Sequence, residues 1–192
     1  MDLQRIGIKI FADDSAPVPV RDFIPVFHTW IQKQAVENHL LIDVHNYSHI
    51  HNGPGILLVA AEGNFSIDMG GGRMGLLYYR KVPGDGLASI LKTTLLACSL
   101  LETDPAFTGH LRFRTGEFQI VANDRLLGPN TEQTFKELLP TLTSALKQIL
   151  PDGKFKLTRS SVDPKDRLTI QVQTGQSESV STLLARLSQT RV

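Results

Sequence analysis

Apolar residues recur along the first part of the chain at the intervals of strands and helices. In residues 4–11 (QRIGIKIF) the alternation places Ile6, Ile8 and Ile10 on one face, which predicts a half-buried strand. From Asp22 the apolar residues of DFIPVFHTWI follow a spacing of three and four, which predicts an amphipathic helix. The short apolar runs 40–44 and 55–61 are bounded by turn residues and predict two buried strands.

The rest of the chain alternates predicted hairpins with predicted helices. The hairpins are expected over 64–68 with 76–81, over 111–114 with 117–122, and over 154–159 with 167–174. Helices are expected over 87–101, from Asn130 onward with Gln133 completing a capping box, and around 180–187. These elements predict an α+β fold in which a mostly antiparallel or mixed sheet carries helices gathered on one face.

The two halves of the chain show a similar order of segments. IKIFADD followed by DFIPVFHTWI parallels FQIVAND followed by TFKELLPTLTSAL. We expect a single domain over 1–192, with 1–103 and 104–192 as two lobes that arose by duplication of a β-α-β-β-α unit. The glycine-tipped hairpin at about 62–81 is then an insertion in the first lobe. Chance similarity between two ordinary amphipathic segments is the alternative.

Composition and charge exclude several classes of protein. The 192 residues include 20 Lys and Arg and 19 Asp and Glu, so the net charge of +1 gives no field that would attract nucleic acid or an anionic membrane. The only cysteine, Cys98, excludes an intramolecular disulfide and a site built from several thiolates. Charged residues interrupt the first thirty positions, and no apolar run reaches the roughly 18 residues that span a bilayer. We therefore expect a cytoplasmic protein without membrane insertion.

Three of the six histidines lie in one short segment that follows a predicted buried strand. Asp43, His45, His49 and His51 are candidate ligands of a divalent metal ion, because imidazole and carboxylate are ordinary ligands for such ions. Extended backbone would turn His49 and His51 the same way, whereas a helical turn would bring His45 and His49 together. The spacing matches neither a HExxH helix nor a zinc finger. A polar turn with solvated histidines is the alternative.

Arginines and glycines suggest a second kind of site. Arg112 and Arg114 alternate with apolar residues, and Arg80 and Arg73 belong to the preceding hairpin, so the four arginines are candidates for binding an anion or an acidic partner. A solvated sheet face with mixed charges is the alternative. The glycines of NGPG and MGGGRMG lack the phosphate-loop spacing and are explained by turns with positive φ at Gly71 or Gly72.

No catalytic signature follows from the remaining polar residues. Glu62, Asp68 and Glu117 are carboxylates at unknown distances from one another, and no nucleophile elbow is present. Cys98 lies in an apolar helix without a neighbouring histidine, which is typical of a core residue.

The segments IPVFHTWIQ, LLIDVHNYSHIHNGPGILLVAAEGNFSID, GRMGLLYYRK and FQIVANDRLLGPNT resemble a conserved family of uncharacterised bacterial proteins, cyanobacterial ones among them. The likeness covers most of the chain. It implies a stand-alone bacterial protein and attaches no activity, cofactor or site residue.

From the sequence we expect a non-catalytic protein that binds another protein, either as a homodimer or as an accessory factor of a larger assembly. The helix over 87–101 carries more apolar surface than one sheet face covers, so its back is expected to be a subunit interface or the centre of a three-layer core. A metal-binding protein or metal-dependent enzyme that uses Asp43, His45, His49 and His51 is the alternative. A small-molecule sensor with its pocket under the glycine-tipped hairpin is a third hypothesis.

Overall fold

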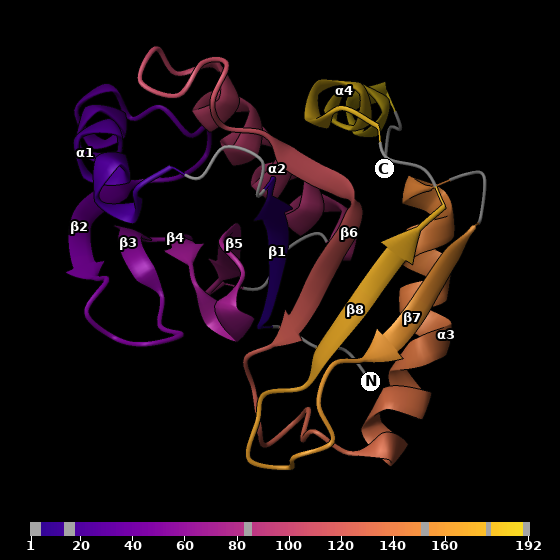
Figure 1. Ribbon diagram of the computed structural model, residues 1–192. Coiled ribbons are helices and arrows are strands. Elements are labelled where there is room, and N and C mark those ends of the chain that lie inside the picture. The colour runs from indigo at the N-terminus through magenta and orange to yellow at the C-terminus, as the bar shows by residue number, and fades with distance from the viewer. Residues whose placement is uncertain (1–4, 14–17, 83–85, 151–153, 176–177, 190–192) are drawn as a thin grey trace.

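The sheet is a single antiparallel layer that runs through both halves of the chain. The computed structural model describes residues 5–13, 18–82, 86–150, 154–175 and 178–189. Within them, eight strands follow the order β2-β3-β4-β5-β1-β6-β8-β7 (Figure 1). The strands are β1 (Ile6–Ala12), β2 (Leu41–Tyr47), β3 (Gly55–Ala60), β4 (Gly63–Asp68), β5 (Gly75–Arg80), β6 (Phe113–Ala122), β7 (Phe155–Arg159) and β8 (Thr169–Thr174).

Four helices pack against one face of this sheet. They are α1 (Phe23–Lys33), α2 (Gly86–Thr103), α3 (Glu132–Ile149) and α4 (Val180–Gln189), and two short 3-10 turns are η1 (Val20–Asp22) and η2 (Gly70–Gly72). Ile6, Ile8 and Ile10 of β1 join one apolar core with side chains from all four helices. In Figure 1, α3 lies behind β7 and β8. The α+β expectation is therefore confirmed, while the internal duplication stays a prediction.

Helix α2 forms the centre of the molecule. Its inner side contacts β1 and β5, and α4 and α3 contact other parts of its surface. Leu95, Cys98 and Leu101 are fully buried. The same chain thus covers part of the apolar surface of α2, and the choice between a subunit interface and a three-layer core stays a prediction. By length and composition alone, Gly86–Thr103 is also apolar enough to cross a membrane.

The predicted hairpin at Thr115 and Gly116 is wrong, because β6 runs through both residues as one strand. Its register with β1 shifts between Ile10 and Ala12, so the Thr-Gly pair belongs to a bulge and not to a turn. β6 pairs with β1 at Phe113 and again from Phe118 onward, so pairing before and after the bulge keeps the strand extended through these turn-forming residues. Of the two arginines expected to alternate along this strand, Arg112 precedes β6 and Arg114 lies within it.

The expected start of α3 is also wrong by one residue. Thr131 is the N-cap, and its Oγ1 accepts a hydrogen bond from the backbone N–H of Thr134 at 3.1 Å. Asn130 is buried instead, and its Nδ2 donates to the carbonyl oxygens of Ser161 and Asp163. The asparagine therefore ties the loop between β7 and β8 to the start of α3.

The helix-free face of the sheet is covered at its centre by the glycine-rich turn. Lys9 lies on this face of β1 and is 2% exposed. Its Nζ donates to the carbonyl oxygens of Gly70 at 2.9 Å and Arg73 at 2.7 Å. Gly71 and Gly72 have φ of 70°, as the turn prediction required. The turn is thus anchored at both ends.

Candidate functional site

A pocket of about 430 Å³ opens at the rim of the core, between the segment that joins α1 to β2, the ends of β4 and β5, and α2. Cavities of this size hold small organic ligands. Val82 and Leu96 supply apolar lining. The polar lining residues that matter below are Glu37, His39, Glu62, Tyr78, Arg80 and Lys92.

His39 and Tyr78 form a hydrogen-bonded pair at the back of the pocket. Nδ1 of His39 lies 3.0 Å from the carbonyl oxygen of Glu37, which can only accept, so Nδ1 carries a hydrogen. In the neutral ring Nε2 then accepts from the hydroxyl of Tyr78 at 2.7 Å. The rings of Phe65 and Tyr78, whose centroids lie 4.6 Å apart, both contact the imidazole, at centroid distances of 5.4 and 5.3 Å. Both ring nitrogens of His39 are therefore engaged.

Tyr78 is fully buried and holds the ring of His39 in position. Desolvation raises the pKa of its phenol, and the adjacent guanidinium of Arg80 offsets part of that rise. A Cβ added at Gly63 would lie 2.5 Å from the Tyr78 ring, so the glycine leaves room for the ring against the neighbouring strand. A buried phenol whose hydroxyl is bonded to His39 positions the histidine.

Two cations lie at the mouth of the pocket. Arg80 at the end of β5 donates from Nη2 to the Ser89 hydroxyl at 2.7 Å. Lys92, one turn further along α2, is exposed. Within the described part of the chain, neither cation lies within ion-pair distance of a carboxylate. Their positive charge is therefore available to an anionic group.

Two carboxylates line the same pocket. Glu62, at the turn between β3 and β4, accepts the backbone N–H of Leu40 at 2.8 Å, and this bond lowers the pKa of its carboxyl. Glu37 lies in the segment that joins α1 to β2 and is exposed. Neither makes an ion pair with a described residue. Glu62 is ionised at neutral pH and is held in place by the backbone, which suits it to receive a cationic group.

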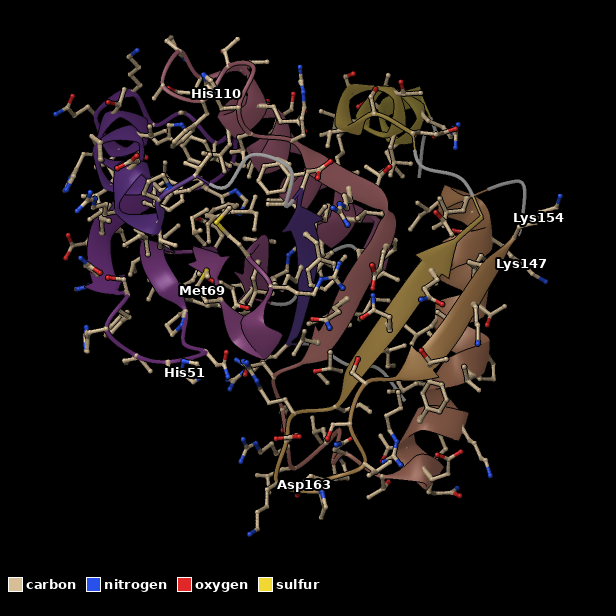
Figure 2. All side chains as sticks on the ribbon, in the orientation of Figure 1. His51, Met69, His110, Lys147, Lys154 and Asp163 are labelled. Atoms are coloured by element: carbon tan, nitrogen blue, oxygen red, sulfur yellow. The ribbon has the colours of Figure 1, made fainter. Side chains whose placement is uncertain are left out.

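The candidate metal ligands do not gather in one place. Asp43 and His45 lie on β2, with His45 Nε2 3.4 Å from Asp43 Oδ2. The ring of Tyr47 lies between those of His45 and His49, at centroid distances of 6.1 and 6.4 Å. His51 is exposed on the turn between β2 and β3, at the rim of the molecule (Figure 2). Among the described residues, no three His, Cys, Asp or Glu side chains are placed to share a metal ion.

The candidate arginines occupy separate places. Arg73 makes two hydrogen bonds to the carboxylate of Glu117, at 2.9 and 3.0 Å, and its guanidinium lies 3.7 Å from the centre of the Phe11 ring. Arg112 lies 4.0 Å from Glu102, and Arg114 donates to Asp13 at 3.0 Å. Arg80 alone of the four lines the pocket described above.

A second cavity of about 290 Å³ lies on the helix-free face, between η2 and the loop that joins β7 to β8. This is the place under the glycine-tipped hairpin that the sensor hypothesis named. Its floor holds the paired side chains of Lys9 and Asp68. Arg167 on its wall donates to the hydroxyl of Tyr79. The charged side chains named here are thus already engaged, in contrast to those of the first pocket.

Sequence reasoning missed most of the pocket. His39 and Lys92 stand alone among apolar or uncharged neighbours, and no motif joins them to Glu62. The one usable signal was that Tyr78 and Arg80 share a face of their strand. Comparison of the chain with protein-family models, with curated proteins and with solved structures found no match.

Proposed function

We propose that this chain is a non-catalytic binding protein for a small zwitterionic molecule, and that α-amino acids are the simplest class of such ligands. Arg80 and Lys92 would receive the carboxylate, and Glu62 with Glu37 would receive the ammonium group. One observation carries the proposal: four charged side chains of both signs line one pocket without an ion-pair partner among the described residues. The cavity of about 430 Å³ accommodates a molecule of this size.

Binding is favoured over catalysis by the state of the polar groups. General acid–base work needs a group that can reach the substrate proton. Both nitrogens of His39 already have partners, and the hydroxyl of Tyr78 is bonded to that histidine and buried. Arg80 is fixed by hydrogen bonds to Ser89 and Tyr78, and Glu62 by the backbone N–H of Leu40, and each keeps further polar atoms for a ligand.

Thermal unfolding in the presence of each of the twenty α-amino acids tests the proposal. A ligand present at about one hundred times its dissociation constant stabilises the folded state by about 2.7 kcal/mol, so a true ligand raises the melting temperature. Propionate and propylamine carry only one of the two charges and serve as matched compounds. We expect stabilisation by one or more zwitterions and none by either matched compound.

Two variants locate the site. Arg80→Met and Glu62→Gln each remove a charge-assisted hydrogen bond of about 1.5–3 kcal/mol, and each is expected to weaken binding roughly ten- to a hundredfold. Lys147→Met on α3, which Figure 2 labels, is the control and should bind like the wild type. If both pocket variants bind like the wild type, the ligand does not bind in this pocket. If propionate alone stabilises the protein, the ligand does not need to be a zwitterion.

The broader expectations from the sequence stay predictions. They are a protein partner or a homodimer, a role as an accessory factor, a bacterial origin and a cytoplasmic location. α4 and α3 cover part of the surface of α2.

A further inference from the structure

The outer edge of β2 has no neighbouring strand among the described residues. β2 is the last strand in the sheet order, and β3 is its partner on the other side. Such an edge can present N–H and C=O groups to another strand. At Leu41 the Gln34 side chain already bonds the backbone N–H at 2.9 Å and the C=O at 3.0 Å, and the register with β3 shifts between Leu41 and Asp43, so the part of the edge that can pair begins beyond this point. The strand contains no proline, and Leu40 and Ile42 near its beginning are 59% and 53% exposed.

The hydrogen bonding of Val44 shows how this edge is arranged. Its backbone N–H donates to Oδ1 of Asp43 at 2.8 Å, which indicates that Val44 turns its polar backbone groups outward. In an antiparallel sheet, outward residues alternate with residues bonded to the neighbour, so Asp43 and His45 bond inward to β3. A second strand would therefore meet the backbone of Val44.

The side chains on either side of Val44 can hydrogen-bond to one another, because the Asp43 carboxylate accepts and the His45 ring carries an N–H donor. Asp43 and His45 lie on the same face of β2, since they are two residues apart. If two copies of β2 meet antiparallel about a two-fold axis at Val44, Asp43 of each copy lies opposite His45 of the other. Opposite side chains in such a pair lie 4.5–5.5 Å apart at Cβ, which is close enough to pair. If the two-fold axis passed through His45 instead of Val44, His45 of one copy would lie opposite His45 of the other, and the Asp43–His45 pairs would be lost.

We infer that this chain forms a symmetric homodimer by antiparallel pairing of β2 with β2 of a second copy, centred on Val44. In the dimer, the N–H of Val44 donates to the Val44 carbonyl oxygen of the second copy in place of the Asp43 carboxylate. Asp43 of each copy then pairs with His45 of the other, and these two pairs fix the register. Pairing is confined to the part of β2 from Asp43 to Tyr47, because Gln34 occupies the backbone groups of Leu41, so the interface is small and the dimer is weak and depends on concentration. The inference is independent of the proposed ligand.

Sedimentation velocity over a range of protein concentrations measures this equilibrium. We expect the wild type to dimerise as concentration rises. Val44→Pro removes the outward N–H and should remain monomeric. His45→Asp places two carboxylates opposite one another, and Asp43→His removes the carboxylate that accepts from the imidazole; each should raise the dimer dissociation constant about tenfold. The double variant Asp43→His/His45→Asp restores both opposite pairs and should dimerise like the wild type.

Lys156→Asp on β7, the other edge of the sheet, is the matched control and should leave dimerisation unchanged. Far-UV circular dichroism establishes that each variant is folded. A wild type that stays monomeric at millimolar concentration overturns the inference. So does a dimer that survives Val44→Pro, or a double variant that dimerises no better than the single variants.

Discussion

Lys9 Nζ lies 2.6 Å from Asp68 Oδ2, and the two side chains form a buried ion pair on the helix-free face of the sheet. Oδ2 of Asp68 also accepts the backbone N–H of Gly70 at 3.0 Å. With the carbonyls of Gly70 and Arg73, all three protons of the ammonium group have acceptors. Burial lowers the pKa of Lys9, while Asp68 acts against this shift. The pair thus holds the glycine-rich turn on the sheet.

Replacing Lys9 by methionine should destabilise the protein strongly. Removing one partner of a buried ion pair costs about 3–5 kcal/mol, because the other charge is left without compensation. Lys9→Met/Asp68→Leu removes both charges and should recover a large part of this loss. Urea denaturation measures both variants. Lys33→Met at the exposed end of α1 is the control, and a loss for Lys9→Met as small as that of the control would contradict the role of the pair.

Two glycines with positive φ should respond differently to alanine. Gly55 has φ of 59°, and an added Cβ would lie 2.1 Å from the carbonyl oxygen of Ile67, so Gly55→Ala must move the paired strand. Gly72 has φ of 70° with open space around it. We expect Gly72→Ala to cost about 1 kcal/mol and Gly55→Ala at least about 3 kcal/mol. Equal losses in urea denaturation would show that the close approach to Ile67 carries no cost.

Most of the elements could be predicted, because their apolar positions repeat at the intervals of strands or helices. Lys9 could not be recognised as buried: between Ile8 and Ile10 it has the pattern of an exposed residue, and only the distant turn at Gly70–Gly72 covers it. His39 and Glu62 meet at the pocket only because the α1–β2 segment and the β3–β4 turn come together through the sheet. Local spacing contains no information on such contacts.

Acid stability should depend on the pair formed by Arg73 and Glu117. The hydrogen bonds from Arg73 lower the pKa of Glu117 below its ordinary value of 4.5. A carboxyl with a lowered folded pKa stabilises the protein above its unfolded pKa, and this contribution is lost as the pH falls through the folded value. Glu117→Gln should therefore lose less stability than the wild type between about pH 5 and pH 2. The midpoints of urea denaturation, measured for both proteins over that pH range, give this difference in stability.

Glu132→Gln is the control for this pH dependence, because Glu132 on α3 has a side chain that is 58% exposed. It should follow the wild type. If Glu117→Gln also loses stability on acidification as steeply as the wild type, the bonds from Arg73 do not contribute to acid stability.

Cys98 should be unreactive in the folded protein. It is fully buried in α2, and desolvation raises the pKa of its thiol well above the ordinary value. The thiolate is the reactive form of cysteine. In the folded protein reagents cannot reach the sulfur, and the raised pKa keeps the thiol protonated. We expect no reaction with 5,5′-dithiobis(2-nitrobenzoate) under native conditions and one thiol per chain in denaturant. Rapid native reaction would show that α2 leaves the core more often than its packing implies.

The central claim is that Arg80, Lys92 and Glu62 receive a zwitterion, and two-dimensional ¹H–¹⁵N NMR tests it most directly. Titration of the isotope-labelled chain with a mixture of the twenty α-amino acids should shift amide resonances of residues 37–40, 62, 78–82 and 89–96, and Arg80→Met should need roughly ten to a hundred times more of the mixture for the same shifts. Unchanged spectra at saturating concentrations of the mixture, or shifts confined to other parts of the chain, would contradict the claim.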